Sequence, residues 1–169
     1  MAHCDQRVRF VATWREEFFE VPLSDLAAKA DCLADDIRGR GINAAYPAFD
    51  VALAQFESAG YQVSDILPEA ASQRLGLARK NAPRPDGRTF WEHYAEVVCA
   101  ELCGNKARLN NLVKNAANGA GASLVTSILT SLSLPAGGAL IAATIAGVIM
   151  ALGVDAFCKY RGYQVSTKP

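Results

Sequence analysis

The chain has 169 residues, 51% of them hydrophobic and 20% charged, and 17 Lys/Arg balance 17 Asp/Glu. A length within roughly 100–200 residues predicts a single domain, and the hydrophobic content excludes a disordered chain. A formal net charge of zero makes nucleic acid an unlikely partner, because such binding needs a basic surface.

The charge is nevertheless divided unevenly along the chain. Residues 1–104 contain 11 basic and 16 acidic side chains, a net −5, whereas residues 105–169 contain 6 basic and one acidic side chain, a net +5. We therefore predict an acidic helical bundle over 1–104 and a basic-flanked hydrophobic hairpin with a short polar tail over 105–169. The alternative is one continuous domain.

Three amphipathic helices are predicted in the first 60 residues, from apolar residues at 3–4 spacing. The first covers residues 8–19. Ser24 is the expected N-cap of the second, which ends at Gly39 or Gly41, and Pro47 opens the third, which ends before Gly60. Their predicted core faces contain Val8, Val11, Phe18, Phe19, Leu26, Ala30, Leu33, Ile37, Phe49, Leu53 and Phe56.

A shorter helix is expected within residues 64–78, followed by an exposed loop at 80–88, which contains two prolines and an Asp-Gly pair. Thr89 and Glu92 have the spacing of a capping box, which predicts a helix that starts at Thr89 and ends at Gly104. Its predicted core face is Trp91, Tyr94, Val98 and Leu102. The fold class is therefore all-α, a multi-helix bundle with a C-terminal hydrophobic helical hairpin.

The hairpin is predicted from two apolar segments joined by a short link at Pro135. Each segment has a stripe of small residues at a spacing of four, which lets two helix backbones approach closely. We expect these stripes to pack against each other in an antiparallel pair. The predicted packing residues are Gly119, Ser123 and Ser127 in the first helix, and Ala139, Ala143 and Gly147 in the second.

The bulky side chains of the second helix are then expected to face outward, toward lipid or another subunit: Leu140, Ile141, Ile145, Val148, Ile149 and Leu152. A membrane-spanning helix needs roughly 20 apolar residues, and the helical part of this segment, residues 138–154, is at the lower limit. A helix that is apolar all round is also typical of a bundle core. Three fates stay open: membrane insertion, burial in the core, or burial followed by release.

Residues 120–155 resemble in composition the Ala/Gly/Ile-rich hydrophobic hairpin inside colicin-type pore-forming toxins. The resemblance implies a helical bundle that hides the hairpin and releases it into a bilayer or an oligomer.

A catalytic alternative rests on the stretch "RTFWEH". Arg88 and His93 have R-x4-H spacing, which is similar to the motif of HEPN ribonucleases, in which Arg and His act on RNA at a dimer interface. The resemblance implies a metal-independent ribonuclease. The other interpretation is an exposed Arg88 and a packed or capping His93.

The five cysteines are Cys4, Cys32, Cys99, Cys103 and Cys158. Their odd number and a polar stretch at residues 1–10 predict reduced thiols and a cytoplasmic protein. The hydrophobic hairpin adds the alternative of a protein that is peripheral to or inserted in the inner membrane. Cys99 and Cys103 are expected to be small buried side chains, and neither a metal nor a cofactor is predicted.

The leading functional prediction is a non-enzymatic protein that acts through its hydrophobic hairpin. The expected partners are a second copy of the chain, another protein, or membrane lipid. A role in a bacterial toxin or antiphage system is one hypothesis, and a soluble adaptor that uses the hairpin as its core is another.

Overall fold

The computed structural model describes residues 23–77, 82–105, 107, 110–112, 114 and 121–159. Within these ranges all regular structure is helical, so the predicted all-α fold class is confirmed. The helix predicted over residues 8–19 lies outside the described residues. The α-helices are α2 (Leu23–Arg40), α3 (Ala45–Ser58), α4 (Glu69–Arg74), α5 (Gly87–Cys103), α7 (Gly121–Ser131), α8 (Ala139–Leu152) and α9 (Val154–Lys159). Three short 3-10 helices, η2 (Ile42–Ala44), η3 (Val63–Asp65) and η4 (Ala136–Gly138), lie in the connections.

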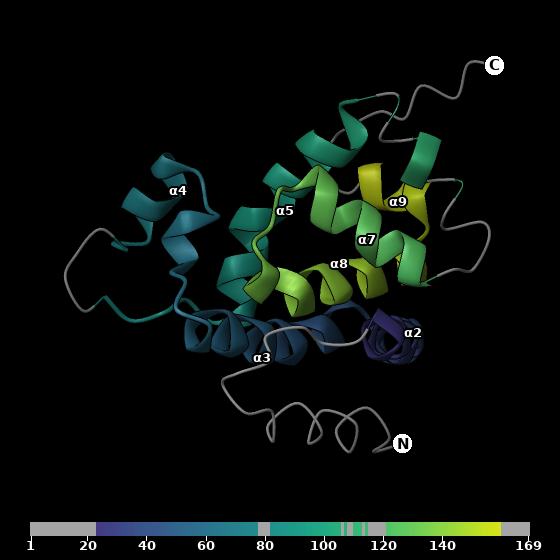
Figure 1. Cartoon of the computed structure of the whole chain (residues 1–169), viewed down its shortest axis with the longest axis horizontal. Helices are drawn as coiled ribbons and strands as arrows, with labels where there is room; N and C mark the ends of the chain where they lie inside the picture. The colour runs from purple at the N-terminus through teal and green to yellow at the C-terminus, as the bar shows by residue number, and fades with distance from the viewer. Residues whose placement is uncertain are drawn as a thin grey trace.

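Helix α8 is the centre of the arrangement. It packs against α2 and α3 on one side and against α7 on the other, so it forms a middle layer (Figure 1). Residues 140–149 are all buried, including the only hydroxyl among them, Thr144. Its hydroxyl donates a 2.7 Å hydrogen bond to the carbonyl of Leu140, which satisfies the polar group inside an apolar core.

The core faces predicted for α2 and α3 are confirmed. Each of these seven side chains is buried: Leu26, Ala30, Leu33, Ile37, Phe49, Leu53 and Phe56. The helix starts differ from the prediction, because α2 begins at Leu23 and α3 at Ala45. Ser24 therefore lies inside α2, and Pro47 lies in the first turn of α3, where its missing N–H costs no helical hydrogen bond. Gly41 ends α2 with a φ of 85°, a conformation that favours glycine.

The helix predicted within residues 64–78 is divided in two by Pro68. The pyrrolidine ring disfavours helical backbone at the preceding residue, Leu67, so the short helix η3 stops and α4 begins after the proline. Residues 82–86, at the end of the predicted loop, contain no helix or strand.

Helix α5 begins two residues before the predicted start, and its cap is Asp86. The Asp86 carboxylate accepts a 2.7 Å hydrogen bond from the backbone N–H of Thr89, so Thr89 is the third helical residue and the predicted Thr89–Glu92 capping box is wrong. The four predicted core residues Trp91, Tyr94, Val98 and Leu102 are buried as expected.

The start of α5 is held against α3. The carboxylate of Asp50 in α3 accepts a 2.5 Å hydrogen bond from the backbone N–H of Gly87. A Cβ at position 87 would collide with the carbonyl oxygen of Tyr46, so only glycine permits this close approach.

Candidate functional site

The bulky residues of α8 lie in the interior of the protein. Ile141, Ile145, Val148 and Ile149 have no exposed surface, Leu140 is 2% exposed, and Leu152 is half-buried. The expectation that these side chains face outward is therefore wrong for this structure. The reason is that α2, α3 and α7 pack against α8, and a helix that is apolar all round requires such apolar neighbours.

Gly147, in the small-residue stripe of α8, faces α2. A Cβ added to Gly147 would lie 3.0 Å from the Cβ of Leu33 and 3.1 Å from the carbonyl oxygen of Ala30, both in α2. Ala143 is buried and Ala139 is half-buried. The prediction that Gly147 packs against the small residues of the preceding helix is thus wrong, although α7 and α8 are in contact.

The other half of the predicted stripe does not line a helix pair. Ser123 is exposed and Ser127 is half-buried, while Gly119 lies outside the described residues. Gly121, at the start of α7, takes the role of the close contact, because a Cβ there would lie 3.4 Å from the Cβ of Ala27 in α2. Both apolar helices therefore present a small residue to α2.

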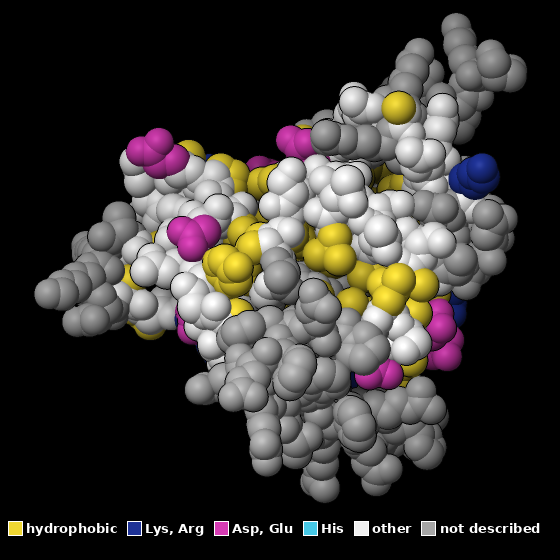
Figure 2. Space-filling model, in the orientation of Figure 1, with side chains coloured by type: hydrophobic (Ala, Val, Ile, Leu, Met, Phe, Trp, Pro, Cys, Tyr) yellow, Lys and Arg dark blue, Asp and Glu magenta, His cyan; other side chains and the backbone are white. Residues whose placement is uncertain are grey.

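The outer side of α7 is an uncharged surface, which we call the α7 face: Ser123, Thr126, Ser127 and Thr130. These positions follow the 3–4 spacing of one helix side, and Ser123, Thr126 and Thr130 are exposed. Between Lys114 and Asp155 the sequence contains no charged residue. Figure 2 shows hydrophobic and uncharged polar side chains where α7 lies, and the acidic and basic groups lie beside this region.

The two threonine hydroxyls of the α7 face bond to their own helix. Thr126 Oγ1 donates to the carbonyl of Ala122 at 2.9 Å, and Thr130 Oγ1 donates to the carbonyl of Thr126 at 3.0 Å. Their proton is thus used internally, whereas the oxygen lone pairs still point outward as acceptors. Half-buried Leu129 and Leu132 lie beside the face and add apolar surface.

The structure does not bring Arg88 and His93 together. Arg88 Nε bonds the carboxylate of Glu92 at 3.1 Å in an exposed i,i+4 pair. His93 is half-buried, and residues five positions apart on a helix point roughly 140° away from each other. A joint action of Arg88 and His93 on one phosphate within a single chain has no geometric support.

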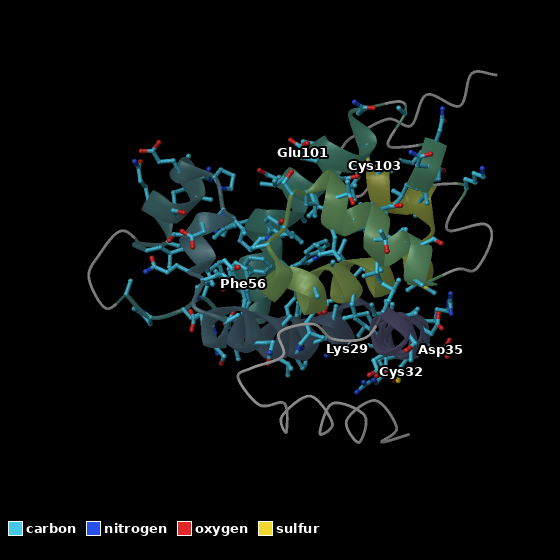
Figure 3. The ribbon with its side chains drawn as sticks, viewed as in Figure 1. Lys29, Cys32, Asp35, Phe56, Glu101 and Cys103 are labelled. Atoms are coloured by element: carbon cyan, nitrogen blue, oxygen red, sulfur yellow. A yellow bond between two sulfur atoms is a disulfide. The ribbon has the colours of Figure 1, made fainter. Side chains whose placement is uncertain are left out.

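Two titratable side chains are largely buried: Lys29, which the sequence analysis did not name, and Tyr94, which it placed in the core. Burial lowers the pKa of Lys29, and its Nζ is enclosed without a hydrogen-bond partner among the residues described (Figure 3). Burial also raises the pKa of Tyr94 in α5. The spacing of Lys29 from Leu26 and Leu33, three and four residues, was the available signal for its position at the edge of the core face.

The cysteines differ from the prediction of reduced thiols. Cys103 and Cys158 form a disulfide with a Cα–Cα distance of 5.8 Å, and Cys32 is also disulfide-bonded. Cys99 is buried and retains its thiol, as expected for a small core side chain. Disulfides are typical of oxidising compartments, so the cysteines no longer support a cytoplasmic localisation. That localisation stays a prediction.

The described residues were also compared with what a metal site and a membrane-spanning helix require. Among the described residues, no group of three His, Cys, Asp or Glu side chains is placed to hold a metal ion. In the same part of the chain, no helix combines the length and the apolar character needed to cross a membrane. No protein family, curated protein or solved structure matches this chain.

Proposed function

We propose that this is a non-enzymatic helical protein that associates with a second copy of itself through the α7 face, while α8 serves as its core. The proposal rests on the different burial of the two helices of the hairpin. Its bulky helix α8 is buried, so α7 is the part of the hairpin that remains accessible to a partner.

The composition of the α7 face favours a protein partner. The centres of protein interfaces are depleted of charged side chains, and this face has none. Desolvating Ser and Thr hydroxyls costs far less than desolvating ionised groups. The half-buried Leu129 and Leu132 provide apolar contact area next to the hydroxyl groups.

Charge and symmetry favour a second copy over an unrelated protein. In a two-fold dimer each face meets itself, so any charged residue near the axis would face a like charge. The α7 face avoids this repulsion, and a formal net charge of zero removes repulsion between whole molecules. The hydroxyl of exposed Ser123 can both donate and accept hydrogen bonds, which makes identical surfaces compatible.

The test is sedimentation velocity of the full chain from about 1 to 100 μM, without detergent. The wild type should change from monomer to dimer across this range. Thr126→Lys puts a charge at the centre of the face and should weaken association roughly tenfold or more, because two like charges meet across the axis. Lysine has a higher helix propensity than threonine, so α7 itself should stay intact.

Ala100→Lys is the matched control. Ala100 is exposed on α5, so this variant adds the same charge to a helix surface outside the α7 face and should associate like the wild type. A wild type that stays monomeric at every concentration contradicts the proposal. If the protein stays monomeric but floats with anionic lipid vesicles, the partner of the α7 face is lipid and not a second copy.

A further inference from the structure

The Cys103–Cys158 disulfide closes a covalent loop around the hairpin. Cys103 is the last residue of α5, Cys158 lies in α9, and the two are 55 positions apart in sequence. Both α7 and α8 lie inside this loop. Figure 3 marks Cys103 at the end of α5, on the side of the molecule that carries α9.

Among the described residues, Phe157 and Cys158 are the side chains of helix α9 that are buried. It follows Gly153, which has a φ of 83°, so the chain changes direction between α8 and α9. Phe157 is buried beside Trp91, with ring centroids 6.3 Å apart, and its carbonyl oxygen lies 3.7 Å from the sulfur of Cys99. The salt bridge between Asp155 and Lys159 lies within α9 and is exposed, so it contributes nothing to docking.

The two cysteines of the disulfide differ in exposure. Cys158 has no exposed surface, whereas Cys103 is half-buried and is followed by exposed Gly104 and Asn105. Cys103 is therefore the side of the disulfide from which we expect a dithiol reductant to approach. Attack on a disulfide sulfur requires such access, since the incoming thiolate must approach along the S–S axis.

We propose that the Cys103–Cys158 disulfide is a reductant-sensitive lock that fastens α9 and the end of α8 to α5. A thiolate of the dithiol attacks Cys103 Sγ, and the S–S electron pair leaves on Cys158 Sγ, which takes up a proton. The second thiolate of the reductant attacks its own sulfur in the mixed disulfide and releases Cys103, which is then protonated. The lock gains two electrons and two protons, and the dithiol becomes a disulfide.

After the disulfide is reduced, one hydrogen bond to α2 is described at the C-terminal end of α8. Arg38 of α2 donates a 2.9 Å hydrogen bond to the carbonyl of Met150, and this contact is exposed. Release of α9 therefore frees the last turn of α8, the helix against which α7 packs. The consequence for self-association rests on the proposed function: association through the α7 face should shift to higher protein concentration after reduction.

The test is hydrogen exchange of the oxidised full chain before and after dithiothreitol. Amide exchange in α9 and the last turn of α8 should become roughly tenfold faster on reduction, since local opening no longer has to strain a covalent loop. The double variant Cys103→Ser, Cys158→Ser should show this fast exchange without reductant and no further change with it. A double variant is needed because either single variant leaves a thiol that can pair with Cys99.

Cys32→Ser is the matched control, because it removes the other disulfide and leaves the lock. It should exchange like the oxidised wild type in α9 and respond to dithiothreitol in the same way. Alkylation followed by cleavage after Glu101 separates Cys99 from Cys103 and verifies which thiol has been released. Unchanged α9 exchange after verified reduction, or a Cys103–Cys158 bond that survives reduction of the Cys32 disulfide, overturns the lock.

Sedimentation of the same samples separates the two proposals. Faster α9 exchange with unchanged self-association supports the lock and removes its link to the α7 face. A wild type that never associates contradicts the proposed function alone, because the exchange measurement does not depend on a dimer.

Discussion

Helices α7 and α8 are neighbours in sequence, both uncharged and rich in small residues, yet they have opposite fates. Helix α8 has one hydroxyl among its residues, Thr144, and it is buried and bonded to Leu140. Helix α7 has five hydroxyl side chains, and three of them, Ser123, Thr126 and Thr130, are exposed on one side. Because neither helix is charged, charge cannot separate them. The hydroxyls of α7 lower its hydropathy and give it a polar side, whereas α8 is apolar all round and becomes the core.

The largest difference between α7 and α8 is expected when a large apolar side chain is truncated in each helix. Ile145→Ala in α8 should reduce the free energy of unfolding by about 3–4 kcal/mol, because the cavity forms in a fully buried layer. Leu129→Ala in α7 removes a half-buried side chain and should cost only about 1 kcal/mol. Urea denaturation measures both, and equal losses would show that α7 is as much a core helix as α8.

A second way is to add volume to both helices. Gly147→Leu forces a side chain against Leu33 and the backbone of Ala30, and overpacking of this kind costs about 1–3 kcal/mol. Ser123→Leu adds a similar side chain to an exposed position and should change stability by less than about 0.5 kcal/mol. Thermal unfolding distinguishes the two, and a tolerant Gly147→Leu variant would contradict the close packing of α8 on α2.

The smallest expected effect concerns the hydroxyls themselves. Thr144→Val removes a buried hydroxyl and leaves the Leu140 carbonyl in its helical hydrogen bond, so stability should change by less than about 1 kcal/mol. Thr126→Val leaves monomer stability equally unaffected but exposes apolar surface on the α7 face. Urea denaturation measures the stability of both variants, and sedimentation measures the self-association of Thr126→Val. A Thr144→Val variant that loses several kcal/mol would mean that this hydroxyl bonds more than its own helix.

Periodicity predicted the buried faces of α2, α3 and α5 well, because each has one apolar side and one polar side. The helix ends were harder, since they depend on contacts between distant segments. Asp50 and Asp86 both bond the first turn of α5, and only the latter is near it in sequence. Pro68 was the local signal that could have divided the helix within residues 64–78.

The candidate site was less predictable for a physical reason. A helix that is apolar all round has no preferred side, so its sequence cannot tell which neighbour each face meets; the outward assignment of Ile145 and Val148 failed on this point. Cysteine connectivity was equally hidden, because Cys103 and Cys158 are far apart in sequence and only their 5.8 Å Cα–Cα distance reveals the pair. The self-association, the resemblance to colicin-type hairpins and the ribonuclease alternative remain predictions for experiment.

The contact between Asp50 and Gly87 has a consequence for recognising relatives of this chain. A side chain at position 87 would separate α3 from α5, and a residue without a short acceptor at position 50 would leave the Gly87 N–H unbonded. Substitutions on the exposed helix surfaces face no such restriction. As sequences diverge, an acidic residue in one helix and a glycine 37 positions later should therefore persist together, and this pair would identify a distant relative after its surface has changed beyond recognition.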